Sequence, residues 1–293
     1  MTASDLKVGM ATPQSWYKST YIVNQEFICR NDKTDILFYV HSAPNNLNNR
    51  NIIRASWGSI KLNKDYKLTL VFLLGDSDDK SINKRILTES RNHHDIIQGA
   101  FRDIYPHLTY KATMGLQWVN THCSNTKYII KTDDDVFVNI PVLIDKLEEL
   151  EIMNMTKNLL MCRVVHDAVV IRDKRYKNHV TDEEYKIHDP DIFPDFCPGF
   201  AIVYSQDAFM NIQEVLGHNT QFLPVDDVFV TGILANIAGI KHTDSSELTG
   251  IAEEDQWKEY MDLNKSRFNQ FMFILVERKP ERIGTLWKKQ QQL

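Results

Sequence analysis

The stretch that decides the fold is Lys127-Tyr128-Ile129-Ile130-Lys131-Thr132-Asp133-Asp134-Asp135-Val136-Phe137-Val138. Its first five residues predict a buried strand, and three carboxylates follow soon after. In an open α/β sheet, ligands bind beyond the carboxyl ends of the strands. Alternate residues of an extended chain project to the same side, so we expect Asp133 and Asp135 to converge on one cation. Oxygen ligands select a hard ion such as Mg²⁺ or Mn²⁺. The alternative is a solvated acidic turn.

The chain before this stretch alternates between short apolar strands and amphipathic helices. The predicted strands are 36–40, 68–74 and 94–98, and the predicted helices are 51–57, 81–91 and 109–123. This alternation predicts a mostly parallel sheet that is covered by helices on both faces.

The second half of the chain is less regular. Pro141 suits the first turn of a helix that continues to Leu150. Further strands are expected at 159–165, 201–204 and 272–276, an apolar helix at 229–238 and a long loop at 172–198. We therefore predict an α/β fold with a mixed, mostly parallel sheet flanked by helices. One catalytic domain is expected over residues 34–293, after a stem or flexible arm over residues 1–33.

Charge and hydropathy exclude several classes of protein. The formal net charge is −5, whereas generic nucleic-acid binders carry a strong basic excess, so no nucleic-acid partner is expected. No stretch approaches 18 consecutive apolar residues, and the first 30 residues lack the pattern of a signal peptide. We expect any membrane anchor to lie outside this chain.

The four cysteines, Cys29, Cys123, Cys162 and Cys197, leave the thiol chemistry open. None belongs to a C-x-x-C pair, which gives a structural zinc site no support. Four cysteines allow three full pairings, and buried free thiols fit the sequence equally well.

A second acidic pair, Asp226-Asp227, precedes an apolar helical segment. Acids in a first turn cap free N–H groups, which stabilises a helix by roughly 0.5–2 kcal/mol. Such a pair can instead hold a general base over a substrate.

The loop 193–201 is rich in proline and aromatic residues, and its Gly199 either permits close backbone approach to a ligand or forms a tight buried turn.

Two arginines, Arg50 and Arg54, lie four residues apart on a predicted helix. They could hold anionic groups by charge-assisted hydrogen bonds, or form surface ion pairs. The chain contains no Gly-rich phosphate loop. A phosphate-bearing ligand would therefore need a metal ion.

Together these motifs resemble the galactosyltransferase family of β1,3-linking enzymes, which use UDP-galactose or UDP-N-acetylglucosamine. The resemblance runs from about Asp35 to Trp287, and its elements occur in family order. They are R-x-x-I-R-x-[ST]-W-G at 50–58, F-L-L-G at 72–75, D-I-I at 95–97, D-x-Y-x-x-L-T-x-K at 103–111, W-x4-C at 118–123, K-x-D-D-D-V-F-V-N at 131–139, a segment like Y-P-x-Y-C-x-G at 193–199 and one like E-D-V-x-x-G at 226–232.

The resemblance implies a GT-A fold and an inverting transfer of galactose or N-acetylglucosamine in β1,3 linkage to a glycoprotein or glycolipid glycan. It also implies dependence on Mn²⁺ or Mg²⁺ and a Golgi membrane protein. Carried over by position, Asp227 is the catalytic base, and Asp135 with Asp133 binds the metal. The resemblance places the UDP-sugar among His41, Ser42, Arg50, Arg54, Asp95, Asp133 and Asp134. It places the acceptor or substrate pocket among Asp226, Phe196, Gly199 and Phe200.

Two positions depart from the family pattern. Asp226 stands where the family usually has Glu, and Val276 stands where many members have a metal-binding His, for which His242 could substitute. A catalytically inactive relative that binds a sugar or a partner is therefore the alternative function. A phosphotransferase with an aspartyl nucleophile is disfavoured by Phe137, because that scheme expects a small or β-branched residue there.

Overall fold

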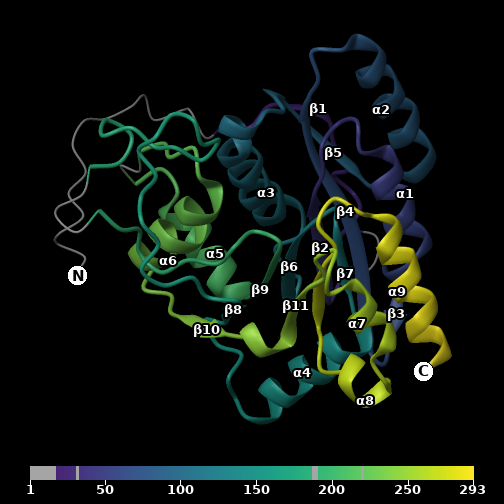
Figure 1. The fold of residues 1–293 in the computed structure, drawn as a ribbon. Coiled ribbons are helices and arrows are strands. Elements are labelled where there is room, and N and C mark those ends of the chain that lie inside the picture. The colour runs from purple at the N-terminus through teal and green to yellow at the C-terminus, as the bar shows by residue number, and fades with distance from the viewer. Residues whose placement is uncertain (1–17, 31–32, 187–190, 219–220) are drawn as a thin grey trace.

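A nine-stranded sheet forms the centre of the computed structural model, which describes residues 18–30, 33–186, 191–218 and 221–293 (Figure 1). The strands of its main path, in spatial order, are β1 (Tyr21–Val23), β5 (Ile96–Arg102), β4 (Tyr66–Asp76), β2 (Ile36–His41), β6 (Tyr128–Asp133), β9 (Ala201–Ser205), β8 (Leu160–Cys162) and β10 (His242–Asp244). A short strand, β3 (Leu62–Asn63), pairs with the start of β4.

The central strands β5, β4, β2 and β6 are parallel, whereas β9 is antiparallel to both β6 and β8. The predicted mixed, mostly parallel sheet is therefore confirmed. The register pairs His41 at the end of β2 with Asp133 at the end of β6. The predicted site residues of these two strands consequently meet at one carboxyl edge of the sheet.

A second sheet forms beside the acidic turn. Its strands are β11 (Thr249–Ile251), β12 (Phe273–Leu275) and β7 (Val136–Val138), and Leu275 pairs with Val136. This pairing carries the segment after β12 to the aspartates, since the Val276 N–H donates to the Asp135 carbonyl at 2.9 Å.

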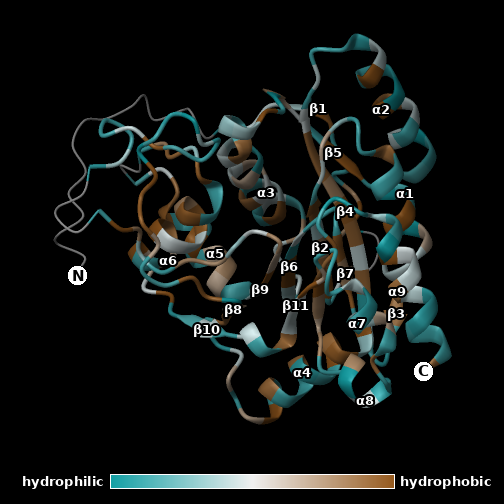
Figure 2. Cartoon of the chain, viewed as in Figure 1, coloured by the Kyte–Doolittle hydropathy of each residue, from teal (hydrophilic) through white to brown (hydrophobic). Residues whose placement is uncertain are grey.

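Helices cover both faces of the main sheet. Apolar residues of α1 (Leu47–Ala55), α2 (Lys80–His93), α4 (Ile140–Ile152) and α9 (Glu281–Gln292) pack on one face, and those of α3 (Leu108–His122), α5 (Gln206–Val215) and η3 (Val228–Leu234) pack on the other. The apolar residues concentrate along the central strands (Figure 2). The remaining helical segments are η1 (Trp57–Ser59), η2 (Tyr105–His107), α6 (Ala235–Ile237), η4 (Ser246–Leu248), α7 (Trp257–Asp262) and α8 (Lys265–Phe268). Among the described residues, no helix combines the length and hydrophobicity that a membrane span requires.

Some predicted boundaries differ from those observed. The strand expected at 94–98 begins at Ile96, because His94 adopts a left-handed conformation and ends α2. The helix expected at 229–238 begins with the π-helical segment η3. π-helical turns are rare and occur frequently at functional sites.

The described part of the predicted N-terminal arm is joined to the domain. β1 pairs with β5, and Cys29 forms a disulfide with Cys123 at the end of α3. The other cysteines also pair, as Cys162–Cys197, so free thiols, one of the two options open from the sequence, are excluded. Residues 1–17 and 31–32 of the expected arm lie outside the described residues.

Candidate active site

The three consecutive aspartates have different surroundings. Asp133 is partly exposed and accepts a hydrogen bond from the buried ammonium of Lys131 at 2.8 Å. Asp134 turns the other way and accepts hydrogen bonds from Ser42 Oγ at 2.5 Å, Asn46 Nδ2 at 3.0 Å and Asn49 Nδ2 at 3.1 Å. Asp134 therefore braces the loop before α1, and its oxygens are already occupied.

Asp135 is a partly buried carboxylate that lacks a cation partner among the described residues. Its Oδ2 accepts a hydrogen bond from the main-chain N–H of Arg278 at 3.2 Å. Burial and the nearby charge of Asp133 raise the pKa of Asp135 to about 6. Two neighbouring carboxylates that destabilise each other's charge are the type of donor set that a hard divalent cation stabilises.

The protein supplies few metal ligands beyond this pair. The described chain contains no group of three or more His, Cys, Asp or Glu side chains arranged to hold a metal. Val276 is fully buried, and His242 Nε2 lies 2.7 Å from the Thr231 carbonyl oxygen. Asp133 and Asp135 still fit such an ion if water and a ligand complete its shell, as is usual for Mg²⁺.

The second acidic pair lies across the site, where η3 begins. The side chain of Asp226 is 13% exposed, and its Oδ2 lies 3.9 Å from His41 Nδ1. Asp227 precedes η3, and its carbonyl oxygen accepts a hydrogen bond from Thr231 Oγ at 2.6 Å. The same hydroxyl accepts from the Cys197 N–H at 2.8 Å. These bonds join the helical segment that carries Asp227 to the loop that carries Gly199.

Gly199 allows Asp227 and Lys131 to approach the same point of the backbone. The Lys131 ammonium donates to the Gly199 carbonyl oxygen, and the Gly199 N–H donates to the Asp227 carboxylate. A Cβ atom on residue 199 would collide with both Asp227 Oδ1 and Lys131 Nζ. The groups that approach Gly199 closely belong to the protein, whereas the sequence prediction concerned a ligand.

Charge balance around Asp227 favours its protonated form. Burial, and then the charge of Asp226, raise the pKa of Asp227 to about 8, while Lys131 opposes the shift. Burial also raises the pKa of Asp226. A carboxyl whose pKa lies near neutrality is suited to general acid–base chemistry.

The residues before α1 form the rear of the site. His41 is buried, burial holds its pKa well below 6.5, and its Nε2 has no hydrogen-bond partner among the described residues. Ser42 Oγ accepts a hydrogen bond from the Arg50 guanidinium at 3.0 Å. Arg50 is fully buried and also binds Glu89 through two hydrogen bonds, of 2.8 and 2.7 Å. Arg50 therefore holds the loop in place rather than facing an open ligand site.

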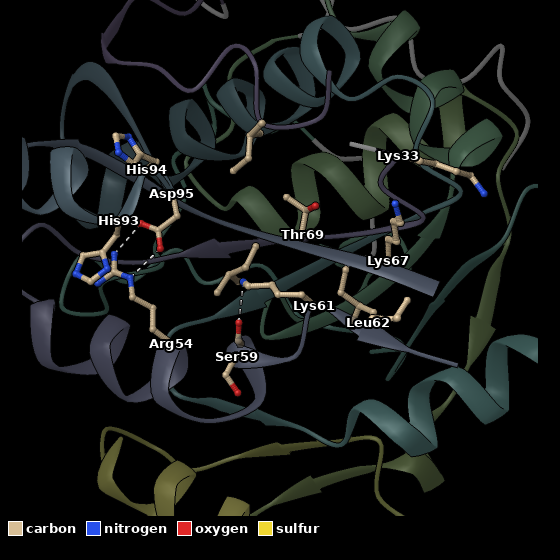
Figure 3. Close-up of a pocket in the computed structure, with 14 residues that line it drawn as sticks. Lys33, Arg54, Ser59, Lys61, Leu62, Lys67, Thr69, His93, His94 and Asp95 are labelled. Atoms are coloured by element: carbon tan, nitrogen blue, oxygen red, sulfur yellow. Dashed lines mark hydrogen bonds and ion pairs between the residues drawn. The ribbon is translucent and has the colours of Figure 1, made fainter. Parts of the chain in front are cut away.

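Arg54 and Asp95 bind each other. Two hydrogen bonds of 2.8 Å join the guanidinium to the carboxylate, and Arg54 also pairs with Glu89. Both residues line a pocket beside the first half of β4 (Figure 3). His41, by contrast, pairs with Leu73, near the other end of β4.

The predicted substrate-pocket residues of the loop 193–201 divide between site and core. Gly199 contacts Asp227, whereas Phe200 is buried in the core that includes α4 and α9, and Phe196 packs against the opposite core.

Two charged residues, Lys131 and Arg278, were not assigned a role from the sequence. Lys131 carries a usable signal, because a lysine inside an apolar strand is uncommon unless it is paired.

Comparisons with known proteins find a matching family model and similar proteins. The family model described as galactosyltransferase matches residues 48–246. The chain is similar to a lactosylceramide 1,3-N-acetyl-β-D-glucosaminyltransferase A of Xenopus laevis, with 33% identity over 75% of this chain and 59% of that protein. It is also similar to a β-1,3-galactosyltransferase 4 of Mus musculus, with 32% identity over 86% of this chain and 71% of that protein. This chain thus spans less than two thirds of the first of these relatives.

The similar solved structures support no conclusion about this chain. The galactosyltransferase LgtC in complex with donor and acceptor sugar analogues is 9% identical, and the match covers 87% of this chain and 95% of that one. Its TM-score is 0.38, which is too low to support a conclusion about fold or function.

Proposed function

This chain belongs to the galactosyltransferase family, and we propose that it transfers galactose from UDP-galactose to a glycan hydroxyl in β1,3 linkage. UDP-N-acetylglucosamine is the second candidate donor. The proposal rests on the position of Asp227, Lys131 and Asp133, which lie together at one carboxyl edge of the sheet. This arrangement supplies a base for the acceptor and an acidic site for the donor in the same place.

Asp227 is the proposed catalytic base. The acceptor hydroxyl must lose its proton as its oxygen attacks the anomeric carbon, and the Asp227 carboxylate accepts that proton. General-base assistance of this kind contributes roughly 10²–10⁴ to a rate. The Gly199 N–H holds the carboxylate in position, and the charge of Lys131 favours its ionised form. Attack from the face opposite the departing UDP inverts the anomeric configuration without a covalent enzyme–sugar intermediate.

The diphosphate end of the donor is proposed to lie against Asp133 and Asp135. A divalent cation, Mn²⁺ or Mg²⁺, held by these carboxylates would offset the charge that develops on the leaving diphosphate. Arg278 supports the same role. Its N–H is fixed to Asp135 Oδ2, and its exposed guanidinium has no carboxylate partner within 4 Å among the described residues.

The backbone beside Asp135 is strained. Glu277 and Arg278 are consecutive non-glycine residues with φ of 40° and 60°. Such conformations cost on the order of 1–3 kcal/mol each and tend to occur at functional sites. The strain therefore supports a functional role for this turn, and Arg278 is the residue within it that suits an anionic ligand.

The cellular setting is also a proposal. Both disulfides are expected to persist in an oxidising compartment, which agrees with a Golgi lumen. We propose attachment to the Golgi membrane, and acceptors on glycolipids or glycoproteins. The names of the two relatives include a lactosylceramide acceptor and a galactosyl donor group, which supports this range.

Release of UDP tests the proposal. The protein is incubated with a panel of UDP-sugars and β-galactoside or N-acetylglucosaminide acceptors, with and without Mn²⁺. We expect acceptor-stimulated UDP release that is largest with UDP-galactose and requires the ion. Acceptor binding without UDP release from any donor would instead indicate a catalytically inactive, sugar-binding relative.

A further inference from the structure

The end of α4 exposes a group of large apolar side chains. Ile152 is 82% exposed, and Met153 and Met155 are each more than half exposed. Apolar side chains that gather on a surface commonly mark a place that another group covers. Asn154 lies among them in the chain and is also exposed. We call residues 152–156 the α4 turn.

The backbone of the α4 turn is held by hydrogen bonds. The Met155 N–H donates to the Leu150 carbonyl oxygen at 2.8 Å, and the Asn154 N–H donates to the Glu151 carbonyl oxygen at 3.0 Å. These two bonds form a Schellman motif, in which Asn154 adopts a left-handed conformation with a φ of 56°. Asparagine is one of the few residues other than glycine that adopt this conformation readily. The motif therefore fixes the Asn154 backbone at the surface.

Asn154 also begins an acceptor sequence for N-linked glycosylation. Asn154-Met155-Thr156 has the form N-x-[ST] with a middle residue other than proline. Among the described residues, none forms a hydrogen bond with the Asn154 side-chain amide. The amide nitrogen is therefore accessible and is not needed for a contact within the fold.

A second acceptor sequence, Asn264-Lys265-Ser266, has a structural explanation. Asn264 Oδ1 accepts a hydrogen bond from the Arg267 N–H at 3.0 Å and thereby caps α8. Asparagine and aspartate are both favoured at such a cap. Helix capping thus accounts for the side chain of Asn264, whereas it does not account for that of Asn154.

The α4 turn lies far from the proposed active site. The Thr156 hydroxyl forms a hydrogen bond with the hydroxyl of Tyr128, the first residue of β6. Asp133 ends the same strand, about 16 Å further along an extended chain. α4 itself lies at the lower side of the molecule in Figure 1. A bulky group on Asn154 would therefore leave the carboxyl edge of the sheet open.

We propose that Asn154 carries an N-linked oligosaccharide, which covers the apolar side chains on either side of it. Such glycans are bulky, solubilising and attached at the surface. The modification forms a bond between Asn154 Nδ2 and the anomeric carbon of the oligosaccharide. It breaks the bond between that carbon and the diphosphate of a lipid-linked donor, and the amide nitrogen loses a proton.

This inference rests on the proposed secretory location of the chain and not on its transfer reaction. The two disulfides support that location, because disulfides persist in oxidising compartments. N-linked glycans are likewise a feature of secreted proteins. The two lines of evidence are independent, since neither cysteine pair includes a residue of the α4 turn.

The test is to secrete the full chain from animal cells behind a cleaved signal sequence, as the variant Asn264→Asp. This substitution removes the second acceptor sequence and keeps a side chain that caps α8. Peptide-N-glycosidase in heavy-oxygen water converts a glycosylated asparagine into labelled aspartate, which peptide mass spectrometry locates. We expect label at residue 154, and no glycan on the double variant Asn154→Gln/Asn264→Asp.

Two substitutions of Thr156 separate the acceptor sequence from the fold. Thr156→Ser keeps both the acceptor sequence and a hydroxyl group for Tyr128, so we expect it to retain the glycan. Thr156→Val keeps the size of the side chain and removes the acceptor sequence, so we expect it to lose the glycan. Absence of label at residue 154, or a glycan that persists in Thr156→Val/Asn264→Asp, would overturn the proposal.

The covering role has its own readout. Enzymatic removal of the glycan should lower the fraction of monomer in size-exclusion chromatography, because it exposes the apolar side chains. An unchanged fraction of monomer would contradict that role. UDP release, measured on the same preparations, should be the same with and without the glycan. A preparation that carries the glycan but releases no UDP would contradict the proposed transfer and leave this inference standing.

Discussion

The ammonium group of Lys131 donates a hydrogen bond to the carbonyl oxygen of Gly199, which ties the strand before the three aspartates to the loop before β9. The same glycine donates its N–H to Asp227, so three segments that are distant in sequence converge on one residue. The position of the proposed base therefore depends on a glycine that carries no reactive group.

Gly199→Ala is expected to impair transfer strongly. The added methyl collides with Asp227 Oδ1 and Lys131 Nζ, so the carboxylate must move, and a displacement of about 1 Å can reduce a rate about 100-fold. We expect kcat to fall by about that factor, while the affinity for UDP changes little. Gly284→Ala is the control, because a Cβ there meets nothing within 4 Å. Full activity of Gly199→Ala would contradict the proposed geometry.

The pH dependence of kcat/KM reports the state of Asp227. Only the ionised carboxylate can accept a proton, and its pKa is raised to about 8, so kcat/KM should fall as the pH falls through that value. Lys131 lowers the pKa of Asp227, and therefore Lys131→Met should move this limb to higher pH. A limb centred near pH 4, the ordinary range for aspartate, would refute the role of the buried environment.

Arg278→Gln is expected to raise the KM for the UDP-sugar about five- to tenfold and to leave kcat nearly unchanged. The physical reason is the loss of a positive charge beside the diphosphate, in an exposed setting where such contacts are modest. Arg175→Gln is the control, since Arg175 pairs with Asp173 in an exposed loop. The affinity for UDP alone, measured by calorimetry, should change in parallel with KM. Equal effects of the two substitutions would exclude a specific contact.

The two disulfides should have separable effects. Replacing either pair with serine removes a cross-link that is expected to contribute about 3–5 kcal/mol to the free energy of unfolding. Cys162–Cys197 holds the loop that bonds to Thr231 and reaches Gly199, so its loss should also reduce transfer at temperatures where the variant is folded. Loss of Cys29–Cys123, which joins β1's segment to α3, should lower the Tm with little effect on kcat. Loss of activity with both pairs alike would contradict this distinction.

The sequence predicts the sheet and the edge where the acids lie, because the strand period and the position of Asp133 at the end of β6 are local features. It could not predict that Asp134 turns away to Ser42, Asn46 and Asn49, since those partners come from a different loop. The pairing of Arg54 with Asp95 is likewise a tertiary contact that no spacing reveals. Cysteine pairing has several solutions on sequence alone, and only the fold selects among them.

The role of Asp227 is tested most directly by comparing transfer and donor binding in Asp227→Asn. This substitution preserves the size of the side chain and removes the proton acceptor. We predict that sugar transfer falls by about 10³-fold, within the range for a lost general base, while the dissociation constant for the UDP-sugar stays within about twofold. Undiminished turnover in this variant would contradict the assignment of the base, and with it the proposed mechanism.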